Sequence, residues 1–140
     1  MDRKGSALWK GSIKEGHGTV STETGVLNNA QYSFSSRFES GTGTNPEELI
    51  GAAHAGCFSM AFSGALGRAG LTAASIATTA TVTVEAVEGG FGITRVHLDV
   101  EAAVPGATDA QFQEIAAGAK AGCPVSKLLN AEITMTAKLA

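Results

Sequence analysis

Hydrophobic and polar positions alternate along much of the chain, and this alternation predicts strands on both sides of one long apolar segment. The expected strands lie at about residues 6–14, 17–23, 31–38, 76–87 and 91–104 and in the C-terminal "AEITMTAKL". A hairpin turn through Glu88–Gly90 joins the fourth to the fifth. In the fifth, Val96, Leu98 and Val100 alternate with charged residues, so one face is expected in the core and the other in water.

The apolar segment between these strands is predicted to be a long helix with a well-marked start. No Asp, Glu, Lys or Arg occurs in the nineteen residues from Leu49 to Gly67. Asn45 is the expected N-cap and Pro46 the first helical residue, and Glu48 completes a capping-box pattern. The segment is long enough to raise the question of a membrane span, but its glycines, serines and single histidine favour a helix buried in a protein core.

Two shorter helices are expected in the last third of the chain. Thr108 and Gln111 form another capping-box pattern, and the helix that they begin should end near Gly122. Pro124 then begins a third, short helix. Because strands and helices do not alternate regularly, the predicted class is α+β, with mainly antiparallel sheets packed around the long central helix. No linker divides the chain, so residues 1–140 are expected to form one domain.

Glycines inside the long helix are a feature that helix propensity does not explain. Gly51, Gly56 and Gly64 each cost about 1 kcal/mol relative to alanine in a helix interior. We therefore expect another element, a second helix of the same subunit or of a partner, to approach this helix closely.

Composition excludes several classes of partner and location. The net charge is −3 and no basic run occurs, so the chain offers no electrostatic footprint for nucleic acid or an anionic membrane. The N-terminal residues lack the apolar stretch of a secretory signal. We expect a cytoplasmic protein that binds neither nucleic acid nor membrane.

The candidate chemistry lies with two cysteines, Cys57 and Cys123. In a reducing cytosol such a pair is more often catalytic, redox-sensing or unpaired than a structural disulfide. His54 lies one helical turn before Cys57, which permits a Cys–His nucleophilic pair or part of a metal site. Two possible ligands on one helix and a third far away make a weak metal signal, and a histidine on an apolar helix is usually structural.

A reactive Cys57 needs a cation, because a thiol of ordinary pKa is only about 3% ionised at pH 7. Arg37 is the candidate, since it comes just before the long helix, and Glu47 or Glu48 would offset its desolvation. Ten residues of helix separate Glu47 from Cys57, a rise of about 15 Å. If Glu47 orients an arginine that touches Cys57, the glutamate and the cysteine therefore come from different subunits.

The two cysteines differ in their local surroundings. Cys123 precedes a proline at an expected helix N-cap, where free N–H groups favour an anion. On this ground alone Cys123 is the more acidic thiol. The residues by themselves leave open which cysteine reacts first.

Two long segments resemble the OsmC branch of the OsmC/Ohr family, the osmotically inducible and organic-hydroperoxide-resistance proteins. These are "GTVSTETGVLNNAQYSFSSRFESGTGTNPEELIGAAHAGCFSMAFSGAL" and "AKAGCPVSKLLNAEIT", with their NPEEL…C and A-G-C-P-V-S motifs. The resemblance implies an intertwined α+β homodimer with a cysteine-based peroxidase site at the subunit interface, without metal or other cofactor. It implies organic hydroperoxides as substrates, in defence against oxidative and osmotic stress.

The resemblance also implies a role for each of four residues. By position, Cys57 matches the peroxidatic cysteine, Cys123 the resolving cysteine, Arg37 the arginine that stabilises the thiolate, and Glu47 the glutamate that holds this arginine. Cys57 then forms a sulfenic acid, which condenses with Cys123 to a disulfide. An external dithiol, often dihydrolipoyl in related proteins, reduces this disulfide.

Two other functions compete with this interpretation. One is a stress-related binding or structural dimer whose cysteines are incidental. The other is a metalloprotein that uses His54 and Cys57. Loss of free thiol on exposure to a hydroperoxide distinguishes the first from a peroxidase, and metal analysis tests the second.

Overall fold

The computed structural model describes all residues of the chain, Met1 to Ala140. The chain forms two compact units, residues 1–49 and 50–140, and each is described here by itself. Each unit contains a three-stranded sheet and helical residues, which confirms the α+β class. The expectation that both units make a single domain stays a prediction.

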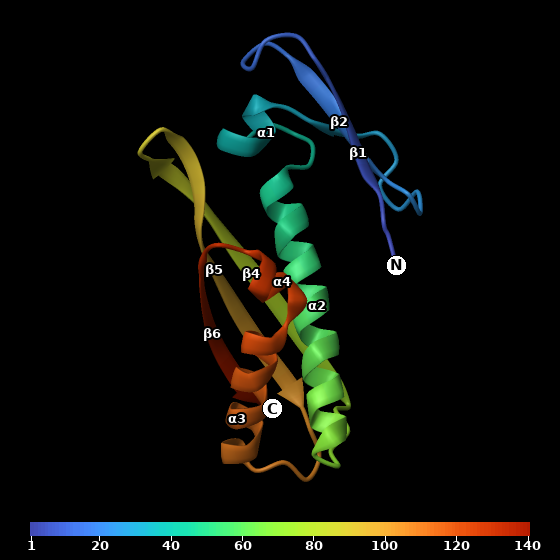
Figure 1. Ribbon diagram of the computed structural model, residues 1–140, viewed down its shortest axis with the longest axis vertical. Helices are drawn as coiled ribbons and strands as arrows, with labels where there is room; N and C mark the ends of the chain where they lie inside the picture. The colour runs from blue at the N-terminus through green and yellow to red at the C-terminus, as the bar shows by residue number, and fades with distance from the viewer. The chain divides into compact units, whose positions relative to one another are not determined.

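The first unit is an antiparallel sheet followed by a short helix (Figure 1). Its elements are β1 (Gly5–Lys10), β2 (His17–Thr22), β3 (Ala30–Tyr32) and α1 (Phe34–Phe38). The rings of Trp9 on β1 and Tyr32 on β3 pack against each other at a tilt of 52°, with their centroids 5.3 Å apart, next to Gly18 of β2. A Cβ on Gly18 would lie 2.6 Å from Tyr32 and 2.8 Å from Trp9, so only glycine permits this aromatic packing.

The strand predicted over residues 31–38 is wrong in its second half, which is the helix α1. Ser33 caps this helix: its hydroxyl accepts a hydrogen bond from the backbone N–H of Ser36, and the Ser36 hydroxyl accepts one from the N–H of Ser33. This reciprocal cap satisfies two backbone donors and starts a helix in a segment whose alternation suggested a strand. Arg37 therefore lies in the last turn of a helix and not at the end of a strand.

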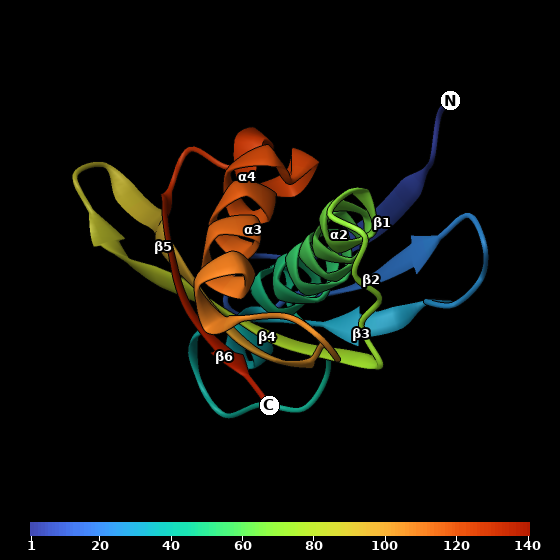
Figure 2. The same cartoon turned by 90° about the horizontal axis from the view of Figure 1, so that it is seen from below.

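The second unit consists of a sheet with helices on one of its faces (Figure 2). Its elements are most of α2 (Pro46–Arg68), then β4 (Ser75–Val87), β5 (Gly90–Ala103), α3 (Asp109–Gly122), α4 (Pro124–Leu128) and β6 (Glu132–Leu139). β4 and β5 form the antiparallel hairpin expected from its turn, whereas β6 pairs with β5 in parallel. A parallel partner needs a long crossover, and here α3 and α4 provide it.

The core of this unit lies between α2, α3 and the sheet. Phe58, Phe62 and Leu66 follow one stripe of α2 and are fully buried. Phe62 meets Phe112 of α3 edge to face at 5.3 Å. The inward positions predicted for β5 are confirmed, because Val96, Leu98 and Val100 lie in this core.

The predicted helix starts are confirmed, with one difference at α2. The side chain of Asn45 accepts a hydrogen bond from the N–H of Glu48, and Thr108 and Gln111 form the full capping box of α3. The carboxylate of Glu48, however, accepts a hydrogen bond from the Thr44 hydroxyl, so it does not close the second half of a capping box. The Thr44 hydroxyl, and not the backbone N–H of Asn45, is thus the donor to Glu48.

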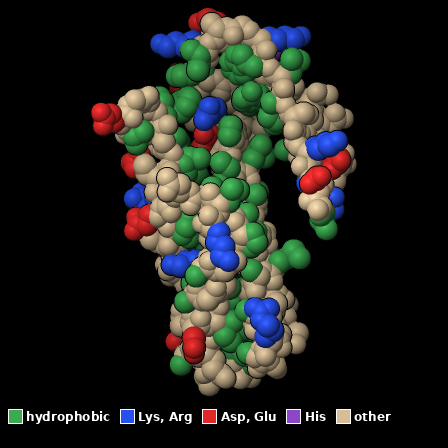
Figure 3. Space-filling view, in the orientation of Figure 1, with side chains coloured by type: hydrophobic (Ala, Val, Ile, Leu, Met, Phe, Trp, Pro, Cys, Tyr) green, Lys and Arg blue, Asp and Glu red, His purple; other side chains and the backbone are tan.

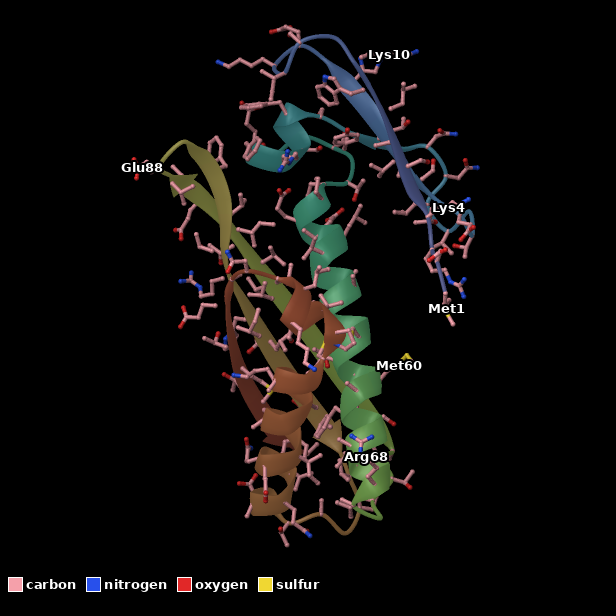
Figure 4. The ribbon with its side chains drawn as sticks, in the orientation of Figure 1. Met1, Lys4, Lys10, Met60, Arg68 and Glu88 are labelled. Carbon is pink, nitrogen blue, oxygen red and sulfur yellow. The ribbon has the colours of Figure 1, made fainter.

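The exposed face of α2 differs from the expectation of a fully buried core helix. By length and composition α2 is apolar enough to cross a membrane, yet only 28% of its most apolar eighteen-residue window is buried within the chain. Figure 3 shows hydrophobic side chains on the surface along this helix, and Met60, labelled in Figure 4, points away from it and is 80% exposed. Residues 50–140 by themselves therefore leave an apolar face of α2 uncovered.

The glycines of α2 also differ in how closely other residues approach them. A Cβ on Gly51 would lie 3.0 Å from the carbonyl oxygen of Ala80, so the close approach predicted there exists, but to strand β4 and not to a helix. A Cβ on Gly56 would meet nothing within 4 Å, and one on Gly64 only the end of the Arg68 side chain. Within residues 50–140, nothing packs closely on these two glycines.

Candidate functional site

The second unit brings Cys57 and Cys123 together. Cys57 lies in the middle of α2, and Cys123 is the residue that joins α3 to α4. Their sulfur atoms are 3.0 Å apart and both thiols are free. Because a disulfide bond is about 2.05 Å long, a small movement joins the two sulfurs. Cys57 is partly exposed, whereas Cys123 is fully buried.

The surroundings of the two thiols push their pKa values in opposite directions. Burial raises the pKa of Cys57, and the hydrogen bond with Cys123 raises it further. Burial also acts to raise the pKa of Cys123, but its interactions with Cys57, with Ser126 and with the backbone of Val125 outweigh burial and lower it. These contacts do not have the geometry of a regular side-chain cap on α4. Among residues 50–140, no cation acts on either thiol.

His54 lies on the same helix as Cys57 but points into the core. Its side chain is fully buried, and its Nε2 lies 2.7 Å from the Oγ of Ser126 on α4. The other ring nitrogen, Nδ1, is buried without a partner. Desolvation by burial lowers the pKa of His54, so the ring is neutral near pH 7.

The lowered pKa of His54 predicts that the protein loses stability in mild acid. Below about pH 6.5 the imidazole of His54 binds a proton in the unfolded state but stays neutral in the folded state. Proton binding therefore stabilises the unfolded state relative to the folded state. The free energy of unfolding should fall by at most about 1.4 kcal/mol per pH unit between this pH and the lowered pKa. Denaturant unfolding at fixed protein concentration from pH 7.5 to 5 measures this slope. His54→Gln should flatten it, and an unchanged slope in that variant would contradict the assignment.

The first unit brings Arg37 and Glu47 together. Arg37 Nη2 donates to Glu47 Oε1 at 2.6 Å and Nε donates to Oε2 at 3.3 Å, a two-pronged ion pair. The Glu47 side chain is 10% exposed and that of Arg37 33%. The guanidinium also lies 4.9 Å from the ring centroid of Phe38. Of the two glutamates considered, Glu47 is thus the partner of Arg37, and it holds the guanidinium in one orientation.

Arg37 also lines an apolar pocket that the sequence did not reveal. The pocket has a volume of about 260 Å³, and three of its lining residues are Trp9, Tyr32 and Phe34. Trp9 is brought to the pocket by strand pairing, because β1 and β3 both flank β2. The first unit therefore presents a fixed guanidinium beside an aromatic surface.

Among the four predicted site residues, the structure forms two pairs, one in each unit. Cys57 is beside Cys123 and Arg37 is beside Glu47. The residue that sequence reasoning missed is Ser126, which is 72 positions from its partner His54. Its one signal was the spacing in "CPVS", one helical turn after Cys123. No group of three or more His, Cys, Asp or Glu side chains is arranged to hold a metal ion.

Comparison of the sequence with known proteins finds relatives over its full length. The family described as OsmC-like protein matches residues 39–138. Peroxiredoxin OsmC of Escherichia coli (strain K12) is 58% identical over 139 residues, which cover 99% of this chain and 97% of the relative. The organic hydroperoxide resistance protein of Xanthomonas axonopodis pv. citri (strain 306) is 33% identical over 101 residues, covering 71% of this chain and 69% of that protein.

Comparison of the structure gives the same picture. The organic hydroperoxide resistance protein OhrB of Bacillus subtilis is similar with a TM-score of 0.75 and 25% identity, covering 96% of this chain and 98% of that one. An OsmC-like protein from Mycoplasma pneumoniae has a TM-score of 0.76 at 14% identity and covers 100% and 98% of the two chains. At so low an identity, the second likeness shows the fold alone.

Proposed function

Because this chain belongs to the family of OsmC-like proteins, we propose that it detoxifies peroxides under stress, as a thiol peroxidase that reduces organic hydroperoxides to alcohols. The observation that carries the proposal is the Cys57–Cys123 pair, with sulfurs 3.0 Å apart. The exposed fraction of each cysteine supports the roles that we propose for them. A hydroperoxide can reach the partly exposed Cys57 but not the fully buried Cys123.

The reaction follows from thiol chemistry. The Cys57 thiolate attacks the distal oxygen of the hydroperoxide, the O–O bond breaks, and the alkoxide takes a proton and leaves as the alcohol. Cys57 is then a sulfenic acid. The Cys123 sulfur attacks it, the S–O bond breaks, and a disulfide and one water form. An external dithiol reduces this disulfide and restores both thiols. Dihydrolipoyl groups are the class of dithiol that the family resemblance favours.

The cation that Cys57 lacks within its own unit is supplied, we infer, by Arg37. Its ion pair with Glu47 and its contact with Phe38 hold a guanidinium in place without adding a net charge. Glu47 and Cys57 are ten residues apart on the continuous helix α2, a rise of about 15 Å. An Arg37 that stays paired with Glu47 and also meets Cys57 therefore belongs to a second copy of the chain.

A homodimer also accounts for the uncovered apolar face of α2. Met60 and the small residues around Gly56 and Gly64 are exposed in the single chain, and a groove of about 620 Å³ runs between α2 and α3. A second copy packed there would bury this surface in the intertwined manner that the family resemblance implies. We place this dimer in the cytoplasm.

The Cys123→Ser variant separates the two cysteine roles. Without the resolving thiol, Cys57 should still be oxidised once by cumene hydroperoxide, and its sulfenic acid should accumulate. Trapping with dimedone and mass spectrometry should find one adduct per chain, on Cys57, while steady turnover with a dithiol falls by at least about tenfold. The reverse pattern, with trapping lost and turnover kept, would exchange the roles.

Stopped-flow oxidation tests the proposed function against a binding or structural dimer. Fully reduced protein is mixed with cumene hydroperoxide, tert-butyl hydroperoxide or hydrogen peroxide, and free thiols are titrated over time. We expect organic hydroperoxides to consume both thiols faster than hydrogen peroxide does. Cys57 packs against the hydrophobic core, and such apolar surroundings suit the organic group of the substrate. If both thiols survive an excess of every peroxide, the cysteines are incidental and the proposal fails.

A further inference from the structure

Cys123 lies at a junction of two helices where the backbone is held on both sides. Its N–H donates to the carbonyl oxygen of Ala119 at 2.9 Å, and its own carbonyl oxygen accepts from the N–H of Lys127 at 3.1 Å. Pro124 follows it, and a residue before proline is restricted to extended backbone. Cys123 has such a conformation, with φ −60° and ψ 125°. Its sulfur therefore does not reach the surface unless the end of α3 or the start of α4 unfolds.

The Cys123 side chain is also enclosed by the core of the second unit. It is fully buried, and it belongs to a hydrophobic cluster whose buried members all lie between Phe58 and Cys123 in the sequence. A second copy of the chain adds contacts to this unit and removes none, so a dimer leaves Cys123 buried as well. Cys57 differs, because it is partly exposed and the proposed function already needs an opening there for the hydroperoxide.

Formation of the disulfide changes this arrangement little. The two sulfurs are 3.0 Å apart, so a disulfide bond of about 2.05 Å needs them to approach by about 1 Å. Cys57 lies in the middle of the 23-residue helix α2, and the helical hydrogen bonds on both sides hold its backbone. The oxidised pair therefore presents one sulfur, that of Cys57, to molecules from outside.

We propose that the external dithiol attacks the Cys57 sulfur of the disulfide and that Cys123 is the leaving group. The inference rests on the proposed function, which supplies the dithiol as the reductant. A thiolate of the reductant forms an S–S bond with Cys57, the bond to Cys123 breaks, and the Cys123 sulfur keeps the electron pair and takes a proton. The second thiolate of the reductant then attacks its partner sulfur in the mixed disulfide. Cys57 leaves as the thiolate, and the reductant, now a disulfide, has given up two electrons.

Cys57 is thus the sulfur at which both halves of the catalytic cycle meet outside molecules. The hydroperoxide oxidises it, and the reductant bonds to it, whereas Cys123 exchanges only with Cys57. The rate of thiol–disulfide exchange depends on access to the attacked sulfur. The structure therefore selects a dithiol that reaches a partly exposed side chain on a helix, and no unfolding around Cys123 is needed for its reaction.

The first test compares the two thiols in single-cysteine variants. Reduced Cys123→Ser and Cys57→Ser proteins each carry one thiol, and an aromatic disulfide reagent that releases a coloured thiol reports its exchange. We expect Cys57 to react at least about tenfold faster than Cys123 in the folded proteins, and the two rates to be similar in denaturant. Equal rates in the folded proteins, or a faster Cys123, contradict the proposal.

Two proline variants test whether the backbone keeps the Cys123 sulfur inside. In the Cys57→Ser background, Pro124→Gly removes the restriction on Cys123 and should raise its rate with the same reagent about threefold or more. Pro105→Gly is the matched control, since Pro105 is also exposed but lies in the turn between β5 and α3. Thermal unfolding checks that both variants fold. No rise in Pro124→Gly, or an equal rise in both variants, contradicts the proposal.

The closing experiment identifies the attacked sulfur directly and needs no peroxide. The wild-type disulfide is formed with diamide, and glutathione, a monothiol, replaces the dithiol so that the mixed disulfide is not resolved within the reductant. Acid quenching at early times, alkylation in denaturant and peptide mass spectrometry locate the adduct. We expect glutathione on Cys57 and the alkyl label on Cys123, at least about tenfold over the reverse. A Cys57 adduct supports the inference even if hydroperoxides leave the thiols untouched, and a Cys123 adduct overturns it even in an active peroxidase.

Discussion

Replacing Cys57 by serine should abolish hydroperoxide reduction, leaving only the uncatalysed background. Serine keeps the size of the side chain, but its hydroxyl does not ionise near neutral pH and does not attack an O–O bond. The buried Cys123 remains in this variant, with a thiol that is not accessible to substrate. Consumption of cumene hydroperoxide with excess dithiol measures the loss, and thermal unfolding checks that the variant folds.

This experiment is informative because local electrostatics and access disagree. Hydrogen bonding lowers the pKa of Cys123, whereas burial raises that of Cys57, so within residues 50–140 Cys123 is the more acidic thiol. The greater exposure of Cys57, however, favours Cys57 as the thiol that meets the hydroperoxide. Peroxidase activity that survives in Cys57→Ser but not in Cys123→Ser would show that acidity decides, and would reverse the assignment.

Replacing Arg37 by methionine should slow the oxidation of Cys57 at least about tenfold at pH 7. If the guanidinium lowers the pKa of this thiol by about two units, its loss removes most of the thiolate at pH 7, because burial raises the pKa of Cys57 and nothing then offsets this. Two units correspond to about 2.7 kcal/mol of stabilisation of the thiolate. The deficit should shrink as the pH rises, because the thiol of the variant then ionises without the guanidinium.

The pH profile distinguishes this effect from damage to the fold. Arg37→Met leaves Glu47, whose side chain is 10% exposed, without its cation, so Arg37→Met/Glu47→Gln should be measured as well, because it removes both charges. Arg95→Met is the matched control: Arg95 is exposed on β5 and has one long hydrogen bond, to Thr83. A rate deficit that does not shrink as the pH rises, or an equal deficit in Arg95→Met, would contradict the role of Arg37.

The sequence predicted most of the fold wherever a local signal was strong. Asn45 and Thr108 mark the starts of α2 and α3, and alternation along β5 identified its buried face. The prediction failed where two local signals competed. In residues 31–38 the aromatic alternation suggested a strand, but the reciprocal hydrogen bonds of Ser33 and Ser36 begin a helix. The parallel pairing of β6 was also missed, because it depends on a crossover and not on the strand itself.

The candidate site was predictable in part for a similar reason. The thiol chemistry of Cys57 and Cys123 and the charge of Arg37 can be read from residue types, and the family resemblance relates them. The contact between His54 and Ser126 arises only when α4 folds back onto α2, so no spacing along the chain reports it. The open surroundings of Gly56 are likewise visible only in the structure. A glycine in a helix suggests that another element packs closely there, but it does not identify that element.

One thiol titration tests the central claim most directly. Reduced protein is treated with one equivalent of cumene hydroperoxide per chain, and free thiols, cumyl alcohol and peptides are then quantified. The proposed chemistry predicts that two thiols per chain fall to none, that one alcohol forms, and that a single disulfide links Cys57 to Cys123. Two remaining thiols and unreduced hydroperoxide would contradict it.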